Sequence, residues 1–344
     1  MPLITTLIFF GLISYYLYQK RQTFTGQEVD YSFGDPVIQK IKSKLDEQEY
    51  TSAEFLINQL DSDELRQAID HVSLNGNVKT IMDWREALPN SQLAILFLGV
   101  SYIHQASLDR GNLPADSLSS EQEELFIDSS NKAINLLEKI NSDPEIKAEA
   151  YAQLLRVAGS TGDFKSADTY FDKCLELNPN HLWAHMEYAE NIQPKWGGNL
   201  EIIEKFIDNL TDDPLVNQTV YLKMVWDSVL ANENLFGGSM KDLKQQAKEL
   251  LFEIDAELNN HPPSSIQKYV LYNYMTVVSE EFGIRALNQK YNKNYRSIVK
   301  IYMDKNSTKS KKNLKNFTSN NQIDKNNLPS QKTLNFILSY SKSV

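Results

Sequence analysis

Apolar residues recur at three- and four-residue steps between residues 36 and 303. This is the period at which side chains return to one face of an α-helix. The stretch VIQKIKSKL, for example, places Val37, Ile41 and Leu45 on one face. The strict alternation of apolar and polar residues that is typical of strands does not occur at any convincing length. The pattern predicts an all-α fold.

Two long helices stand out in this pattern. Segment 91–106 (SQLAILFLGVSYIHQA) is apolar on nearly every side, so it is expected to be a central, buried helix. Segment 123–140 is apolar along one face and is followed by Asn-Ser-Asp-Pro, which predicts an amphipathic helix that ends there. Shorter helices are expected over 53–60 and 64–72, the second entered through favoured N-cap residues at 61–63.

Residues 148–181 have the spacing of two antiparallel helices packed closely together. Aromatic side chains would fill the space between the helices, alanines would allow close approach, a glycine would make the turn and a proline would end the second helix. The residues that carry this pattern are Tyr151, Leu154, Leu155, Ala158, Gly162, Phe164, Ala167, Phe171, Cys174 and Pro179. The unit resembles a tetratricopeptide repeat (TPR), which predicts stacked antiparallel helix pairs forming a TPR-like α-solenoid.

A Gly-Gly corner occurs twice, forty positions apart. PKWGGNL and LFGGSM share an aromatic residue, two glycines, a capping residue and an apolar residue. Asn199 and Ser239 are favoured N-cap residues, and the glycines permit positive φ. Trp196 and Phe236 would pack just before the cap, much as in a hydrophobic staple. We interpret both copies mainly as turns that start a helix.

Two functional interpretations of the first corner remain open. The free amides of the helix could bind an anion with the help of Lys195, although Glu201 and Glu204 oppose it. Alternatively, an exposed Trp196 beside Lys195 could contact a peptide, since tryptophan is enriched at binding hot spots. A phosphate-binding P-loop does not fit, because the lysine precedes the glycines and no strand leads into them.

The combination of these motifs is similar to a bacterial TPR-like domain of unknown function. That family is marked by an Arg-Gly turn, here Arg110–Gly111, and by a Pro-Lys-Trp-Gly-Gly loop, and the similarity covers roughly residues 45–260. The resemblance implies a fold but no catalytic residues. It also implies a concave groove, lined by the first helix of each pair, that holds a protein or peptide partner. The candidate partner-binding residues are Arg156, Trp183, Met186, Glu190, Lys195 and Trp196. For some of these, packing against a neighbouring helix is the alternative role.

Composition narrows the classes of partner. The chain has 344 residues, 41% hydrophobic and 23% charged, and a formal net charge of −10, which argues against a nucleic-acid partner. Cys174 is the single cysteine, so an intrachain disulfide is impossible and no cysteine-based zinc site is expected.

His181 and His185 are the candidate metal ligands. They are four residues apart, with Glu187 nearby, so both imidazoles share one helical face. The order is not His-Glu-x-x-His, however, and no third ligand is evident. We therefore expect structural histidines, with no metal, cofactor or catalytic residue. A metal-dependent hydrolase that uses these two histidines is kept as an alternative.

The N-terminus carries an apolar segment. Residues 3–18 contain no charge and are followed at once by Lys20 and Arg21, which predicts a single membrane anchor over residues 1–22. A cleaved signal peptide lacks support, because there is no basic region before the segment and no small-x-small site after it. The positive-inside rule places the body in the cytoplasm, at the inner membrane, with the periplasm as the alternative.

The C-terminus differs in composition. Residues 303–344 carry eight lysines against two aspartates and few apolar residues, so a basic, disordered tail is expected. The predicted organisation is an anchor (1–22), a linker (23–35), a TPR-like helical domain (36–302) and this tail (303–344).

The sequence as a whole predicts a membrane-anchored, non-catalytic protein-interaction or scaffold protein. An immunity or chaperone-like protein that holds one specific partner is the alternative within the same class.

Overall fold

The computed structural model of the chain describes residue 32 and residues 35–75, 78–111, 118–141, 143–260 and 265–294. Regular structure in these ranges is helical, and no strand occurs there. The all-α prediction is therefore confirmed for the described part of the chain.

The described helices correspond to the predicted pattern. Their bounds are α2 (Pro36–Asp46), α3 (Tyr50–Ile57), α4 (Ser62–Asn75), α5 (Val78–Ala87), α6 (Gln92–Arg110), α7 (Ser120–Leu137), α8 (Pro144–Thr161), α9 (Phe164–Leu177), α10 (Leu182–Asn191), α11 (Leu200–Asp208), α12 (Pro214–Ala231), α13 (Met240–Asn260) and α14 (Ser265–Glu281). A short 3-10 helix, η2 (Pro194–Trp196), lies between α10 and α11.

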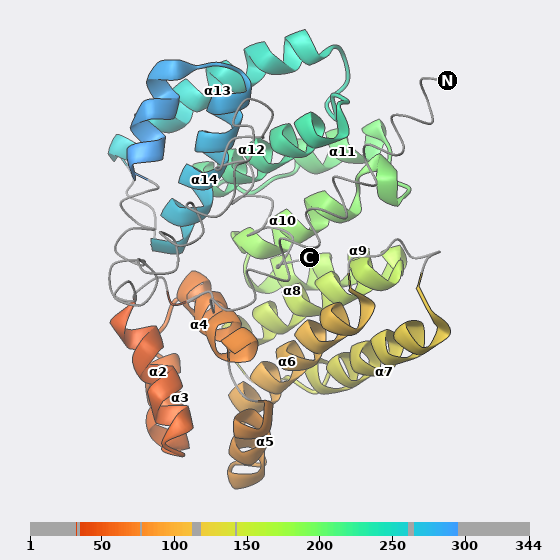
Figure 1. The fold of residues 1–344 in the computed structure, drawn as a ribbon, viewed down its shortest axis with the longest axis vertical. Coiled ribbons are helices and arrows are strands. Elements are labelled where there is room, and N and C mark those ends of the chain that lie inside the picture. The colour runs from red at the N-terminus through yellow and green to blue at the C-terminus, as the bar shows by residue number, and fades with distance from the viewer. Residues whose placement is uncertain are drawn as a thin grey trace, which may run out of the picture.

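The helices stack as successive pairs. The first helices of the pairs, α2, α4, α6, α8, α10, α12 and α14, each contact the next in the series. The second helices α3, α7, α9 and α13 pack against their own partners. The array curves until α14 contacts α4 again, and Figure 1 shows these two helices close together. The first helices therefore face the inside of a tightly curled solenoid.

A shared capping device starts three of these first helices. In α2, α8 and α12, an aspartate accepts hydrogen bonds from backbone amides of the first turn, and a proline follows it at the first helical position. The aspartates are Asp35, Asp143 and Asp213. Proline is well tolerated at this position, because the N–H that it lacks would have no hydrogen-bond partner within the helix. The sequence Asp-Pro thus fixes where the first helix of a pair begins.

The core consists of two apolar clusters that meet at α8. One cluster joins α2–α7 to α8 and includes Trp84, packed edge-on against Phe97 with ring centroids 5.4 Å apart. The other joins α8 to the helices that follow it. Helix α6 is buried along most of its length, as predicted. In α2, Ile41 and Leu45 of the predicted face are buried, whereas the assignment of Val37 is wrong, because Val37 is exposed and Ile38 is buried instead.

Two terminal predictions lie outside the described residues. These are the membrane anchor at residues 3–18 and the basic tail at 303–344. Within the described part of the chain, no helix combines the length and the apolar character needed to cross a bilayer.

Candidate functional site

The first Gly-Gly corner connects α10 to α11. After η2, Gly197 takes a φ of 94°, in the left-handed region. Gly198 approaches the preceding turn so closely that an added Cβ would lie 1.7 Å from the carbonyl oxygen of Ile192. Asn199 then caps α11 by accepting a hydrogen bond from the amide of Ile202 at 3.0 Å. The predicted turn and cap are confirmed, and each glycine has its own steric reason.

The second corner repeats this arrangement between α12 and α13. Gly237 and Gly238 have φ angles of 80° and 82°. The Ser239 hydroxyl accepts a hydrogen bond from the Asp242 amide at 3.2 Å, and the Asp242 carboxylate accepts from the Ser239 amide at 2.9 Å. This reciprocal capping confirms the predicted N-cap. The corners touch, because a Cβ on Gly237 would lie 3.3 Å from Leu200.

The aromatic residues of the two corners differ in their surroundings. Phe236 is half-buried and stacks on Tyr221, with ring centroids 4.4 Å apart. Trp196, by contrast, is 38% exposed. The packing expected before the cap therefore occurs in the second corner, whereas the first presents a large aromatic ring to solvent.

Glu190, near the end of α10, holds the exposed corner. Its Oε1 lies 2.5 Å from the ammonium of Lys195 and accepts a hydrogen bond from the indole Nε1 of Trp196 at 3.4 Å. The Lys195 ammonium also lies 5.7 Å from the centre of the Trp196 ring. The Lys195 side chain is 54% exposed. Three of the predicted partner-binding residues are thus brought together in one contact group.

A buried lysine lies behind this group. The ammonium of Lys223 is 2.8 Å from Glu190 Oε2 and 2.5 Å from the carboxylate of Asp227, and its side chain is only 2% exposed. Gln193 donates hydrogen bonds to both carboxylates, at 3.1 and 2.7 Å. Burial alone would raise the pKa of Glu190, but the charges of Lys223 and Lys195 outweigh it and hold that pKa well below its usual range. For Asp227, burial dominates and the pKa is raised.

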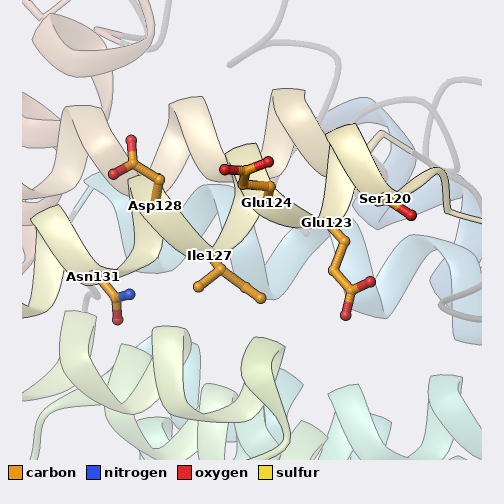
Figure 2. A pocket seen from close by; sticks show the side chains of 6 residues that line it. All are labelled: Ser120, Glu123, Glu124, Ile127, Asp128 and Asn131. Atoms are coloured by element: carbon orange, nitrogen blue, oxygen red, sulfur yellow. The ribbon is translucent and has the colours of Figure 1, made fainter.

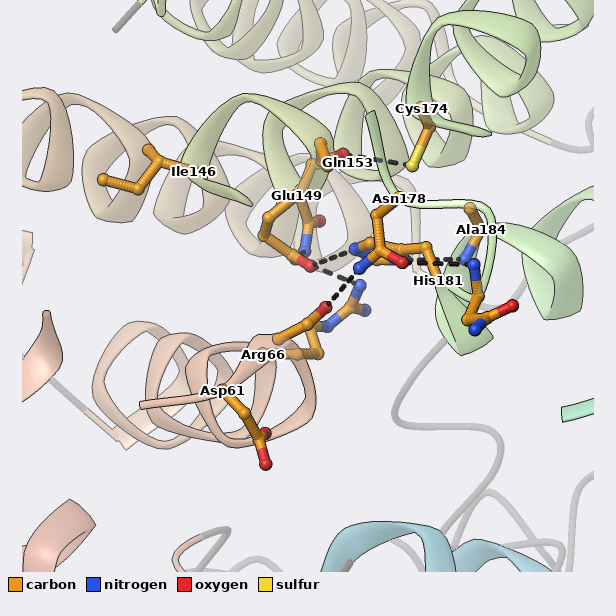
Figure 3. A network of polar contacts seen from close by, with 12 residues as sticks. Asp61, Arg66, Ile146, Glu149, Gln153, Cys174, Asn178, His181 and Ala184 are labelled. Atoms are coloured by element: carbon orange, nitrogen blue, oxygen red, sulfur yellow. Dashed lines mark hydrogen bonds and ion pairs between the residues drawn. The ribbon is translucent and has the colours of Figure 1, made fainter. Parts of the chain in front are cut away.

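A second buried polar network ties α4 to the inner face of α8 and α10 (Figure 3). Arg66 lies 3.1 Å from Asp70 and 3.4 Å from Glu149, and its guanidinium lies 5.0 Å from the centre of the Trp183 ring. Glu149 also lies 3.1 Å from the imidazole of His181. Arg66, Glu149 and His181 are nearly excluded from water, whereas the Asp70 side chain is 21% exposed. The buried charges therefore need one another for charge balance.

The other predicted partner-binding residues lie along this inner face or below it. Arg156 is 8% exposed and interacts electrostatically with Glu187, Asp70 and Glu149. Trp183 is half-buried beside Arg66, and Met186 is buried in the apolar core. The structure therefore divides the six predicted residues into two groups. Glu190, Lys195 and Trp196 lie together at the corner, and the other three are buried or half-buried. Their role in binding a partner stays a prediction.

His181 and His185 both have structural contacts. The Nδ1 atom of His181 accepts a hydrogen bond from the Ala184 amide at 3.2 Å, which caps α10. The His185 Nε2 atom lies 2.8 Å from the carbonyl oxygen of Pro179. Among the residues that the structure describes, no three His, Cys, Asp or Glu side chains are placed to hold a metal ion together. Cys174 is buried, and burial raises the pKa of its thiol.

A shallow depression on the surface of α7 offers no comparable arrangement (Figure 2). It is lined by Ser120, Glu123, Glu124, Ile127, Asp128 and Asn131, all from one helix. Asp128 is paired with Lys132 at 2.6 Å. A reaction site usually converges from several elements, which this surface does not do.

Sequence reasoning missed the two buried networks, although a local signal exists for each. Lys223 and Asp227 are four residues apart within the otherwise largely apolar helix α12, and Arg66 and Asp70 have the same spacing in α4. Opposite charges at this spacing usually mark a solvated helix face. Here they lie inside, where a charge has to be paired.

The buried His104 leads to a pH-dependent prediction. Its imidazole lies 3.7 Å from Asp70, and burial, aided by Arg156 and Arg66 and opposed by Asp70, lowers its pKa from 6.5 to about 4. The unfolded chain then takes up a proton near pH 6.5, whereas the folded chain takes it up only near pH 4. The free energy of unfolding should therefore fall by up to about 3 kcal/mol as the pH is lowered from 6.5 to 4. Urea unfolding at a series of pH values measures this.

The matched variant for this prediction is His104→Gln. It removes the titrating group, so its unfolding free energy should depend less steeply on pH between 6.5 and 4. His185, whose pKa is also lowered by burial, contributes in both proteins and leaves a residual slope. An unchanged slope in the variant would show that His104 does not titrate as described.

Comparison with known proteins identifies one repeat. Residues 148–181, which contain most of α8, all of α9 and the turn between them, match the family model described as "Tetratricopeptide repeat". No curated protein matches the chain. The match and the stacked helix pairs together support a TPR-like helical repeat, whose usual role in proteins is to bind other proteins or peptides.

Proposed function

We propose that this protein is a non-catalytic scaffold of the TPR-like class that binds another protein through the corner formed by Glu190, Lys195 and Trp196. The observation that carries the proposal is the exposed indole of Trp196 on a repeat scaffold, held by a hydrogen bond to Glu190. A large aromatic side chain that is already fixed loses little conformational entropy on binding, which favours it as an anchor residue.

The inner face takes a supporting role in this proposal. Arg156, Trp183 and Met186 lie on α8 and α10, whose packing fixes where the corner stands. Arg156 and Met186 are buried, so a partner reaches the concave side at its accessible edge, beside Glu190. Substitutions of the buried residues should then act through stability, whereas substitutions at the corner act on binding.

The experiment that tests this proposal is affinity capture from cells with the full-length chain in mild detergent. Trp196→Ala should reduce the recovery of a specific partner at least tenfold, since truncating an anchor residue costs about 2 kcal/mol or more. Phe252→Ala is the matched control, because Phe252 is 51% exposed and lies about three turns beyond the start of α13. Equal recovery with wild type and Trp196→Ala, in equally folded proteins, would refute the binding role of the corner.

Membrane attachment forms a separate part of the proposal. It is supported by the uncharged segment 3–18 and by Lys20 and Arg21 directly after it. The resemblance of the Arg110–Gly111 turn and the Pro-Lys-Trp-Gly-Gly loop to a bacterial domain makes the inner membrane the proposed location, with the body in the cytoplasm. A reporter fused to the C-terminus tests this orientation. Activity of a reporter that works only in the periplasm would show that the body lies on the periplasmic side.

A further inference from the structure

The chemistry of the exposed corner indicates what kind of group it accepts. The two oxygens of Glu190 face different surroundings. Oε2 contacts the buried Lys223, and Oε1 contacts Lys195 and the indole of Trp196, both of which are exposed. The Oε1 atom of this largely buried carboxylate therefore lies on the side of the exposed residues, beside an aromatic ring.

Lys195 already occupies this position from within the chain. Its ammonium is 2.5 Å from Glu190 Oε1 and 5.7 Å from the centre of the Trp196 ring. A carboxylate together with an aromatic face attracts cations through charge and through the ring quadrupole. The lysine side chain is 54% exposed, against 17% for Glu190, so water partly screens the pair and the ammonium can leave for solvent.

Charge balance behind the corner favours a cation at the same place. Glu190 and Asp227 carry two negative charges when ionised, whereas Lys223 supplies one positive charge. The remaining negative charge is offset by Lys195. If Lys195 moves away, another cationic group, or a proton on Asp227, whose pKa burial raises, restores the balance.

The helix that carries Glu190 shows a related contact farther inside the protein. Trp183, also on α10, has the guanidinium of Arg66 over its ring at 5.0 Å, and Glu149 completes the contact at 3.4 Å. A tryptophan and two carboxylates, Glu149 and the nearer Asp70 at 3.1 Å, thus hold an arginine inside the protein. Trp196 and Glu190 repeat this combination at the surface.

We propose that Glu190 and Trp196 form a subsite for one cationic side chain, that Lys195 fills it in the free protein, and that an arginine or lysine of the partner displaces Lys195 on binding. This inference rests on the proposed function and adds the chemistry of the partner, a basic protein segment. Arginine fits better than lysine, because its planar guanidinium can stack on the ring while it pairs with the carboxylate. The acidic charge of the chain as a whole, −10, also favours approach of a basic segment.

The test uses the full-length chain in detergent and an acetylated, amidated tetra-arginine peptide as the probe. Binding is followed by NMR through the indole N–H signal of Trp196, which is assigned by its loss in Trp196→Phe. The peptide should shift this signal in wild type. Lys195→Met removes the competing ammonium, so the affinity for the peptide should rise about three- to tenfold. A tetra-glutamate peptide should leave the signal unchanged.

Two further variants separate the subsite from general attraction between opposite charges. Glu190→Gln should lower the affinity for the peptide at least fivefold. If this variant proves unstable, Trp196→Leu replaces it and should also weaken binding. Because Trp196→Leu lacks the indole signal, titration calorimetry then measures peptide binding. Glu204→Gln is the control, because Glu204 is an exposed carboxylate on α11 and its removal changes the net charge equally. Its effect should stay within twofold.

Specific outcomes overturn the inference. It is wrong if the peptide does not shift the Trp196 signal, if Lys195→Met leaves the affinity unchanged or lowers it, or if Glu204→Gln weakens binding as much as Glu190→Gln. If partner capture still requires Trp196 in any of these cases, the proposed function stands and only the cation subsite fails. If the peptide binds as expected while capture is independent of Trp196, the proposed function fails instead.

Discussion

Replacing Arg66 with methionine is expected to lower the free energy of unfolding by about 3–5 kcal/mol, the range for breaking a buried ion pair from one side. Arg66 is buried and pairs with Asp70 and Glu149. Burial alone would raise the pKa of Asp70, but the charges of Arg66 and the contact with His104 hold it well below its usual range. Methionine preserves much of the volume and removes the charge, so two carboxylates would be left without their main partner.

Urea unfolding followed by circular dichroism measures this effect. Arg285→Met is the matched control, because Arg285 is exposed in the helical segment at residues 285–294, and its replacement should change the unfolding free energy by less than about 0.5 kcal/mol. A loss below about 1 kcal/mol for Arg66→Met would mean that α4 is not tied to the inner face through this residue.

Replacing Lys223 with methionine is expected to have an effect of similar size, about 3–5 kcal/mol. The substitution leaves Glu190 and Asp227 side by side without the buried ammonium that lies between them. Repulsion between the carboxylates should also displace Glu190, and with it the contacts to Lys195 and Trp196. Unfolding free energy and the indole N–H signal of Trp196 should therefore change together.

A second substitution tests the cause of that loss. In Lys223→Met combined with Asp227→Leu, the charge that lacks a partner is removed, and Glu190 keeps its contact with Lys195. Replacing a buried pair by apolar residues is often nearly neutral, so the double variant should recover most of the stability. A double variant as unstable as the sum of its two single variants would show that the charges act independently.

Local chemistry explains which parts of the structure the sequence could predict. Helical period, the Gly162 turn and the caps at Asn199 and Ser239 all depend on residues a few positions apart. Val37 was wrongly assigned to the buried face of α2, because the sequence of one helix does not show which neighbouring helix that face will contact. Pairs of adjacent helices were therefore predictable, and the direction in which each face points was less so.

The candidate site was harder to predict, because its contacts are distant in sequence. Arg66 and Glu149 are 83 residues apart, and Glu190 and Lys223 are 33 apart. In the curled array, the first-helix side chain of Arg156 is buried. Burial of that kind depends on the rotation between successive helix pairs, which a single matched repeat does not reveal. Lys195, Trp196 and Glu190 were found from sequence, but their common contact was not.

Position-specific photocrosslinking tests the binding role of the corner most directly. A photoreactive benzoylphenylalanine is placed at position 195 of the full-length chain, and in a second protein at position 252. The corner should crosslink one specific protein in cells from position 195, and Trp196→Ala in the same chain should abolish that product, while position 252 gives no such product. Crosslinking of the same protein from position 252, or a product at 195 that persists in Trp196→Ala, would contradict binding at the corner.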